Sequence, residues 1–406
     1  MRVSSRAIVT SVAAFALAVG WIGASGASAR PASEPPAARH IVVFHDDVDP
    51  DAVARDHGRR HGAQVERVYH NALKGYVATF KGTGAADVAR DPRVDFVELD
   101  QKVSVHGDQA MVDGEPWGLD RIDERDHPLD KNYHYANTGA GVTAYIIDTG
   151  IRSSHQEFGS RVLAAPHRFD AFGGTGEDCD GHGTHVAGTV GGATYGVAKA
   201  VDLVPVRVLN CTGSGSWSGV IAGIDWVTGH HINRSKTTLS KSVANMSLGG
   251  PTSSAVDAAV NKSINAGVTY AVAAGNGNVA GVAQDACKSS PARVPNALTI
   301  GATDSTDRKA SWSNFGKCVD LFAPGVNVLS AFSAGNTASA TMSGTSMASP
   351  HTAGVVALYL QTADTLLEVG PSAVRTALVG ALTTNVVSAA GKGSFNGLLY
   401  SGVSAP

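Results

Sequence analysis

The stretch EDCDGHGTHVAG, from Glu177 to Gly188, contains carboxylates, a cysteine and two histidines three residues apart. Three kinds of chemistry use such residues. Carboxylates and imidazoles bind zinc, acidic side chains cap the start of a helix, and a histidine steadied by a carboxylate serves as a base. The segment alone does not decide among these roles. The decision depends on which other reactive side chains the chain offers, and in which order.

Two other segments add an acid and a nucleophile. Asp148 ends the apolar run in AYIIDTG (144–150), where a buried carboxylate needs a partner. Ser346 lies in SGTSMASPH (343–351), among small residues that let a peptide backbone come close. Singly, each has a structural explanation: the aspartate as a helix cap or buried ion-pair partner, the serine segment as a glycine-capped helix. With His182 they supply a nucleophile, a base for its proton and a carboxylate that orients the base.

Attack on an amide also requires donors for the oxyanion that develops. Asn276, in VAAGNGN (272–278), follows another apolar run and is a candidate donor, and the backbone N–H of Ser346 is a second. The order Asp, His, Ser excludes an α/β-hydrolase, in which the histidine comes last. After Ser346 the chain has only His351, five residues along the same expected helix. Among serine hydrolases, the observed order is that of subtilisin.

The elements that position these residues alternate along the chain. Nearly continuous apolar runs indicate strands buried on both faces of a parallel sheet, at 141–148, 201–209, 242–248, 267–276 and 296–303. Helical patterns lie between and after them, at His182–Gly192, Ser218–Thr228, Ser254–Ala266 and Thr345–Thr362. The predicted fold class is therefore α/β, a doubly wound and mostly parallel sheet with helices on both faces. Active groups in such sheets lie at the carboxyl ends of strands, where Asp148, Ser247 and Asn276 stand.

A smaller α+β domain is predicted ahead of this sheet. HIVVFH (40–45) reads as a strand, and the next segment as a helix with Asp49 as N-cap and Pro50 at its first position. Two strands, a short helix over 82–92 and a last strand from Arg93 follow. This β-α-β-β-α-β order is ferredoxin-like. The segment contains no convincing catalytic set, so we expect it to assist the larger domain.

The amino terminus reads as an export signal. Residues 1–29 have a basic start, an apolar stretch and an Ala-Ser-Ala cleavage site. A membrane anchor is the alternative, but the apolar run is interrupted by polar and small residues. The chain has 406 residues, 17% of them charged, and a net charge of −3. This balance gives no reason to expect nucleic acid as a partner, or a membrane once the signal is removed.

Four cysteines, Cys179, Cys211, Cys287 and Cys318, favour two disulfides in an oxidising compartment. Three pairings are open to them. The nearest-neighbour choice, Cys179–Cys211 with Cys287–Cys318, closes two loops of similar length.

The motifs resemble the signature segments of the subtilases. The segments that carry this resemblance are AYIIDTGI, DGHGTHVAGTV, SLGG, AAGN and GTSMASPH, from about Trp117 to the end of the chain. EPWGLDRID, VPVRVLNCTGSGSWSGVIAGIDWV and the cysteine ahead of the histidine motif are similar to the proteinase K and aqualysin branch. The resemblance implies that Asp148 orients the imidazole of His182, which acts as general base and acid. Ser346 would be the nucleophile and Asn276 the oxyanion donor. His185 is then structural, and zinc, which needs three or four convergent ligands, is disfavoured.

The resemblance also implies how substrate binds. An extended peptide would add as a strand between two chain segments, Gly213-Ser214-Gly215 and Ser247-Leu248-Gly249. Trp217 would wall the S4 pocket, and Ala273, Ala274 and Gly275 would line S1 with small side chains. Turn formation is the plainer explanation of these glycines.

A structural calcium ion is a further implication of the resemblance, with no cofactor needed for catalysis. The matching ligand positions are the carbonyls of Pro295 and Ala297 and the carboxylate of Asp320. Oxygen ligands suit this hard cation. Since only one carboxylate is present, a solvated Asp320 is an equal alternative.

The sequence thus predicts a secreted, monomeric serine endopeptidase of broad specificity, acting on proteins and peptides through an acyl-enzyme. The early ferredoxin-like segment resembles the inhibitor-type propeptide of the same family. The expected segments are therefore a signal peptide (1–29), a propeptide that chaperones folding and inhibits (30–107), and a peptidase domain (108–406). Maturation would be a self-cleavage near Gly107–Asp108. A secreted esterase, a catalytically silent binding protein and a narrow processing protease are the alternatives. An esterase would hydrolyse esters but not casein. Nothing supports a silent protein, because every triad and oxyanion position is intact, and a narrow processing protease would call for acidic pockets and an added domain.

Overall fold

The computed structural model describes residues 38–104, 108–110 and 116–403. The expected signal peptide, most of the linker after it and Gly107 lie outside these residues. Within the described ranges, no helix combines the length and apolar character that a membrane crossing requires.

The first domain has the predicted ferredoxin-like order. Its four strands form an antiparallel sheet in the order β2-β3-β1-β4. The elements are β1 (Ala38–Phe44), α1 (Pro50–His61), β2 (Gln64–Tyr69), β3 (Gly75–Phe80), α2 (Gly84–Val88) and β4 (Val94–Leu99). Asp49 caps α1 as predicted, because its Oδ1 accepts the N–H groups of Asp51 (3.0 Å) and Ala52 (3.2 Å).

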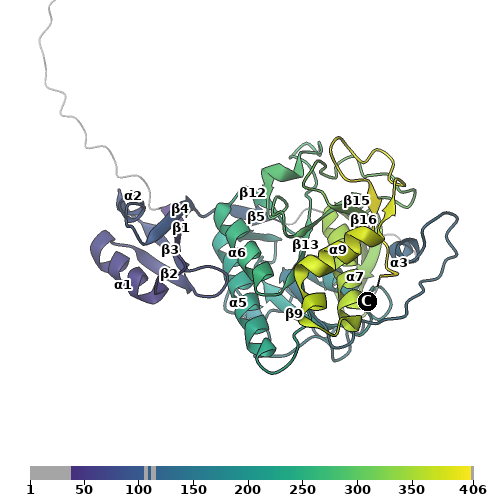
Figure 1. Cartoon of the computed structure of the whole chain (residues 1–406), viewed down its shortest axis with the longest axis horizontal. Helices are drawn as coiled ribbons and strands as arrows, with labels where there is room; N and C mark the ends of the chain where they lie inside the picture. The colour runs from purple at the N-terminus through teal and green to yellow at the C-terminus, as the bar shows by residue number, and fades with distance from the viewer. Residues whose placement is uncertain (1–37, 105–107, 111–115, 404–406) are drawn as a thin grey trace, which may run out of the picture. The chain divides into compact units, whose positions relative to one another are not determined.

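The second domain is built on a sheet of nine described strands whose central members are parallel (Figure 1). Their order is β19-β20-β16-β15-β13-β11-β7-β9-β8. The bounds are β7 (Thr143–Asp148), β8 (Phe169–Asp170), β9 (Asp202–Arg207), β11 (Ser242–Met246), β13 (Thr269–Ala273), β15 (Leu298–Thr303), β16 (Leu321–Pro324), β19 (Thr383–Thr384) and β20 (Gly397–Leu398). All five apolar runs form strands of this sheet, so the predicted α/β class is confirmed.

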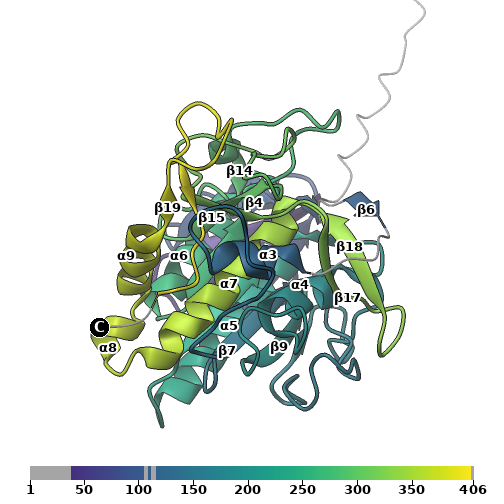
Figure 2. The same cartoon turned by 90° about the vertical axis from the view of Figure 1, so that its right-hand side faces the viewer.

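Helices cover both faces of the sheet. The bounds are α3 (Trp117–Ile122), α4 (His182–Gly191), α5 (Trp217–Ser235), α6 (Ser254–Asn265), α7 (Thr345–Thr362), α8 (Leu366–Val369) and α9 (Pro371–Ala381). Neighbouring strand residues face opposite ways. Ile146 of β7 packs in one core with α4 and α7, whereas Ile147 packs in another with α5 and α6. This division is visible in Figures 1 and 2.

The prediction placed α7 correctly and α5 too short. The helix expected over Ser218–Thr228 runs on to Ser235. Beyond Thr228, His231 is buried and its Nδ1 lies 2.9 Å from Ser242 Oγ, so polar residues there do not mark an end of the helix.

The other described strands of this domain form three small sheets, two of them with strands of the connecting chain. β10 (Ser214–Ser216) pairs with β5 (Lys102–Ser104), and β6 (Asp108–Ala110) joins β18 (Ser339–Ser343) and β17 (Val328–Ala331). β12 (Gly250–Pro251) pairs with β14 (Ser289–Ser290), beside a single 3₁₀ turn at Ala286–Lys288. β5 and β6 belong to the chain that connects the two domains, and each adds an antiparallel strand to the second domain.

Candidate active site

Asp148 and His182 meet at the carboxyl end of β7. Asp148 is the last residue of β7, His182 is the first of α4, and His182 Nδ1 lies 2.8 Å from Asp148 Oδ1. Both side chains are buried. Burial lowers the pKa of His182, but the charge and hydrogen bond of Asp148 outweigh it, so the pKa lies above the ordinary value of 6.5. The imidazole is therefore a stronger base than a free histidine.

Asp178 and Asp180 of the EDCDGHGTHVAG stretch cap the start of α4. Asp178 Oδ1 accepts the N–H groups of Asp180 (2.9 Å) and Gly181 (3.0 Å), and its Oδ2 accepts that of Thr184 (2.9 Å). Asp180 Oδ1 accepts the N–H of His182 itself at 3.1 Å. These bonds satisfy the open donors of the helix start and fix the backbone from which His182 extends.

His185 is held apart from this pair. Its Nε2 donates to the carbonyls of Val328 (3.0 Å) and Ala340 (3.1 Å), on two strands packed beside α4. Burial lowers its pKa to about 3, so it stays neutral. Because the two histidines face different partners and Asp178 caps the helix, the four side chains do not converge on one metal ion.

Ser346 is the second residue of α7, which packs against α4 (Figure 2). Its Oγ donates to the carbonyl of Ser247 at 3.1 Å, and Ser247 Oγ donates to the Ser346 carbonyl at 2.7 Å. His182 Nε2 is buried and has no hydrogen-bond partner among the described residues. The Ser346 hydroxyl must therefore rotate away from the Ser247 carbonyl before it can donate to His182 Nε2.

Asn276 is tied to the start of the same helix. Its Oδ1 accepts both the N–H and the hydroxyl of Thr345, each at 2.8 Å. With the oxygen end held by the residue next to Ser346, the amide nitrogen is the end that can donate to a substrate.

The segment predicted to line S1 is fixed from behind by Asn314. This buried side chain donates to the Ala274 carbonyl (2.8 Å) and accepts from the Gly277 N–H (3.1 Å). Gly275 between them has φ +97°, and a Cβ there would come within 2.6 Å of Asn314 Nδ2, so glycine is needed at this position. Ala273 and Ala274 are buried.

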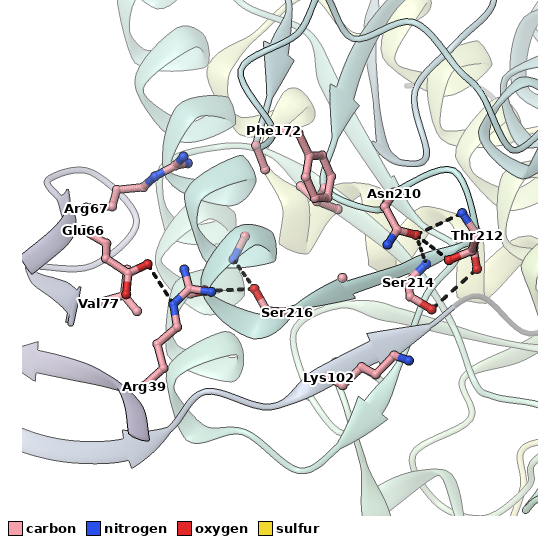
Figure 3. Close-up of a pocket in the computed structure, with 15 residues that line it drawn as sticks. Arg39, Glu66, Arg67, Val77, Lys102, Phe172, Asn210, Thr212, Ser214 and Ser216 are labelled. Atoms are coloured by element: carbon pink, nitrogen blue, oxygen red, sulfur yellow. Dashed lines mark hydrogen bonds and ion pairs between the residues drawn. The ribbon is translucent and has the colours of Figure 1, made fainter. Parts of the chain in front are cut away.

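The predicted substrate strand already has a partner. β5 pairs antiparallel with β10, Val103 facing Gly215 and Ser104 facing Ser214, and β5 also contacts β12 beside Gly249. Figure 3 shows β5, with Lys102, beside Ser214 and Ser216 of β10. Lys102, Ser214, Ser216 and Phe172 help to line a cavity of about 510 Å³. Asn210 Oδ1 accepts the Ser214 N–H at 3.1 Å and shapes the turn that contains Gly213.

Trp217 and Leu248 lie behind this strand. Both are buried in one apolar cluster that also includes Leu209 and Val103 of β5. Val103 of the added strand therefore packs into the same apolar cluster as Trp217.

The cysteines pair as the nearest-neighbour choice predicts. Cys179–Cys211 joins the approach to α4 to the loop after β9, and Cys287–Cys318 joins the 3₁₀ turn at Ala286–Lys288 to the segment before β16.

Two of the three residues predicted to bind calcium face one cationic group. The guanidinium of Arg375 donates to Asp320 Oδ1 (2.6 Å) and to the Ala297 carbonyl (3.3 Å), while Pro295 is exposed nearby in the chain. The oxygens thus converge on a positive charge, as a cation site requires. Among the described residues, Asp120, Glu124 and Asp130 form another group of oxygen donors whose atoms lie within 4.8 Å of one another.

Sequence reasoning missed Thr345, Asn314 and Arg375. Each acts through a contact between distant segments, and none stands in a spacing that marks it. Thr345 alone gave a hint, since it lies within the SGTSMASPH segment next to Ser346.

Comparison with known proteins agrees with this geometry. Residues 139–396 match the subtilase family, and residues 39–106 match the peptidase inhibitor I9 family. An extracellular serine proteinase of Thermus sp. (strain Rt41A) is 53% identical over 84% of this chain and 78% of its own length. Alkaline serine exoprotease A of Vibrio alginolyticus is 48% identical over 83% of this chain and 60% of its own length.

A solved structure, the crystal structure of a cold adapted subtilisin-like serine proteinase, superposes with a TM-score of 0.64. It is 50% identical and covers 71% of this chain and 98% of that one. The match to the subtilase family extends over more than half of the sequence. The chain therefore belongs to the subtilase family and is a serine endopeptidase preceded by a propeptide of the I9 inhibitor family.

Proposed function

We propose that Asp148, His182 and Ser346 form the catalytic triad of a broad-specificity endopeptidase. The observation that carries the proposal is the buried 2.8 Å contact between His182 Nδ1 and Asp148 Oδ1. Because the aspartate holds Nδ1, the opposite ring nitrogen is the one that takes the proton of Ser346 as its oxygen attacks the peptide carbonyl. His182 then gives that proton to the leaving amine. A water molecule releases the acyl group in a second cycle, and no cofactor takes part.

The oxyanion of each step is stabilised by two donors, the amide nitrogen of Asn276 and the backbone N–H of Ser346. Thr345 supports this role, because it fixes the oxygen end of Asn276 against the start of α7. Ser346 lies in the first turn of α7, at the positive end of the helix dipole, so its N–H is suited to an anion.

Substrates bind as an extended strand on β10, in the manner of β5. The pairing uses main-chain groups, and main-chain hydrogen bonds select little among sequences. The S4 pocket is formed by Trp217 and Leu248, which share an apolar cluster with Val103, and S1 is lined by Ala273, Ala274 and Gly275. Small, uncharged walls favour a range of apolar residues, in keeping with broad specificity.

Maturation is a self-cleavage between Ser104 and Asp108. β5 ends at Ser104 on the substrate strand β10, and β6 begins at Asp108 opposite Ser343, three residues before Ser346. The expected Gly107–Asp108 bond is within this interval, although Gly107 lies outside the described residues.

The propeptide inhibits by docking on α5 and α6 while its last strand fills the substrate groove. Asp100 accepts the N–H (2.9 Å) and hydroxyl (2.6 Å) of Ser218 at the start of α5. Glu98 accepts the N–H of Ser254 (3.0 Å) at the start of α6 and the hydroxyl of Ser253. Acids at helix starts complement the helix dipole, so both contacts favour the docked state.

The enzyme is secreted and works as a monomer. The basic and apolar start of the chain supports export, as does the similarity to an extracellular proteinase. A structural calcium ion binds at Ala297 and Asp320, whose oxygens converge on a common positive charge.

The test of the proposed function is Ser346→Ala. This precursor should remain uncut, and active enzyme added in trans should cut it between Ser104 and Asp108, as N-terminal sequencing would reveal. Ser343→Ala, three residues away, is the control and should mature. A pure Ser346→Ala protein that matures at the wild-type rate would refute both the nucleophile and self-cleavage.

A further inference from the structure

The cation that Ala297 and Asp320 face belongs to the chain itself. Arg375, on α9, donates from Nη2 to Asp320 Oδ1 at 2.6 Å and from Nη1 to the Ala297 carbonyl at 3.3 Å. Asp320 Oδ2 accepts the N–H of Thr299 at 2.8 Å, so both carboxylate oxygens are engaged. The Asp320 side chain is 15% exposed and that of Arg375 is 33% exposed.

These contacts satisfy a requirement of the fold. Asp320 begins the chain into β16, and Ala297 precedes β15, the neighbouring parallel strand. Bringing a carboxylate and a carbonyl oxygen together with little solvent leaves negative charge that needs a positive partner. Guanidinium supplies that partner with planar donors that suit a carboxylate.

A divalent ion would need the same atoms. Calcium holds its oxygen ligands at about 2.3–2.6 Å, and Asp320 Oδ1 and the Ala297 carbonyl each already accept from Arg375. The guanidinium and the ion cannot both occupy the space between these oxygens. A groove beside Arg375, lined among others by Asn296, Ser372 and Thr376, gives the displaced side chain a route to solvent.

We propose that Arg375 is the resident cation of the Ala297–Asp320 site and that calcium binds there only by displacing its guanidinium. The inference rests on the proposed calcium site and adds a competitor to it. The contacts of Arg375 stabilise the ion-free enzyme. Calcium binding is weakened by the same free energy, because the ion must break these contacts. The site is thus set for surroundings rich in calcium, and the fold survives where calcium is scarce.

The test uses the full-length Ser346→Ala chain, which cannot digest itself. Calcium binding is measured by calorimetric titration after chelation, and melting is measured in chelator and in calcium. Arg375→Gln should bind calcium roughly tenfold more tightly at one site, because calcium no longer has to displace a guanidinium there. It should also melt at a lower temperature in chelator, and calcium should restore the loss.

Three variants complete the design. Adding Asp320→Asn to Arg375→Gln should abolish the tight site, which separates it from the acidic group at Asp120, Glu124 and Asp130. Arg308→Gln removes an exposed arginine and should change neither quantity. Arg375→Lys keeps a charge with a single-point donor and should give an intermediate affinity, which tests the idea even if Arg375→Gln folds only with calcium.

The outcomes separate the two proposals. If Asp320-dependent binding is equally tight with and without Arg375, the competition is overturned and the calcium site stands. If no Asp320-dependent binding appears in any variant, both are overturned. Tighter binding in Arg375→Gln, together with its calcium-dependent melting, supports both.

Discussion

The basicity of His182 is the residue property on which the proposed chemistry depends most. Burial alone would make the imidazole a poor base, and Asp148 reverses that effect through its charge and its hydrogen bond. Asp180 raises the pKa of His182 further through its charge, while its Oδ1 holds the His182 N–H. Asp148 thus orients the imidazole ring, and Asp180 raises its pKa from the start of α4.

This arrangement predicts the acid side of the pH profile. His182 must be neutral to accept the serine proton, so kcat/KM should fall as pH drops through a pKa that lies above 6.5. Asp180→Asn removes a charge that raises this pKa, so its acid limb should move to lower pH with little change in the plateau. Asp364→Asn, an exposed acid, is the control and should leave the limb in place. A limb that moves to higher pH in Asp180→Asn would contradict this electrostatic account.

Asn276 is predicted to act in the transition state. Asn276→Ala should lower kcat by roughly 10²–10³ with KM little changed, the range known for this donor in subtilisin itself. Asn278→Ala, an exposed residue two positions along the same loop, should have no comparable effect. Steady-state kinetics on a peptide ester and a peptide amide would measure both. A change confined to KM would remove Asn276 from the oxyanion site.

The reactive residues could be predicted from the sequence because their chemistry is demanding and their order is informative. Their supports could not. Asn314 and Thr345 act by holding Ala274 and Asn276 in place, and nothing in the sequence indicates which distant asparagine will reach a given loop. Arg375 lies in an ordinary amphipathic segment, and its contacts depend on how α9 packs on the sheet.

At the scale of elements, the site is made by helix starts placed against strand ends. α4 begins at His182 and α7 at Thr345, and both pack on the face of the sheet that Ile146 shares. Gly344 precedes α7, and small buried residues follow along its first turns. The helix can therefore lie close to β11 and β13. Buried strands and this helix were predictable from apolar runs. β16 and β20 were not, since strands of four and two residues are too short to show a clear pattern.

The Cys179–Cys211 disulfide is predicted to support this geometry. It closes a separation of 32 residues that includes α4 and β9, and Cys287–Cys318 closes one of 31 elsewhere. Replacing either pair with serines should cost about 3–4 kcal/mol of unfolding free energy, because the loops are similar in length. Only the Cys179/Cys211 variant should also lose kcat/KM. Urea unfolding of Ser346→Ala proteins measures the first effect, and equal kinetic losses in the two pairs would contradict the second.

At the scale of the whole chain, the propeptide completes a core that the peptidase domain shares with it. Ile41, Val43 and Val77 of the first sheet lie in the same apolar cluster as α5 and α6. The alternate residues Val42 and Tyr76 pack on the propeptide's own helices. Because one face of this sheet packs on α5 and α6, we propose that the propeptide guides the folding of these helices, since parallel sheets fold slowly.

Asp225 of α5 is predicted to control how long the propeptide stays bound. Its Oδ1 accepts the N–H groups of His70 (3.2 Å), Asn71 (2.5 Å) and Ala72 (2.8 Å) in the loop between β2 and β3. Asp225→Ala should speed propeptide release after self-cleavage by about tenfold, since charged acceptors are worth roughly 1.5–3 kcal/mol and this one is partly solvated. The lag before activity appears would shorten. Asn233→Ala, exposed on the same helix, is the control, and an unchanged lag in Asp225→Ala would show that the contact is unimportant.

The central claim, that an alcohol is activated by a histidine held by a buried acid, can be measured by covalent trapping. A serine-directed phosphonylating reagent should inactivate the mature enzyme with one adduct per molecule, and peptide mass mapping should place it on Ser346. His182→Ala, prepared from a precursor cut in trans, should react slower by orders of magnitude. Complete inactivation with the adduct on another residue, or a His182→Ala enzyme that is labelled at the wild-type rate, would contradict the account.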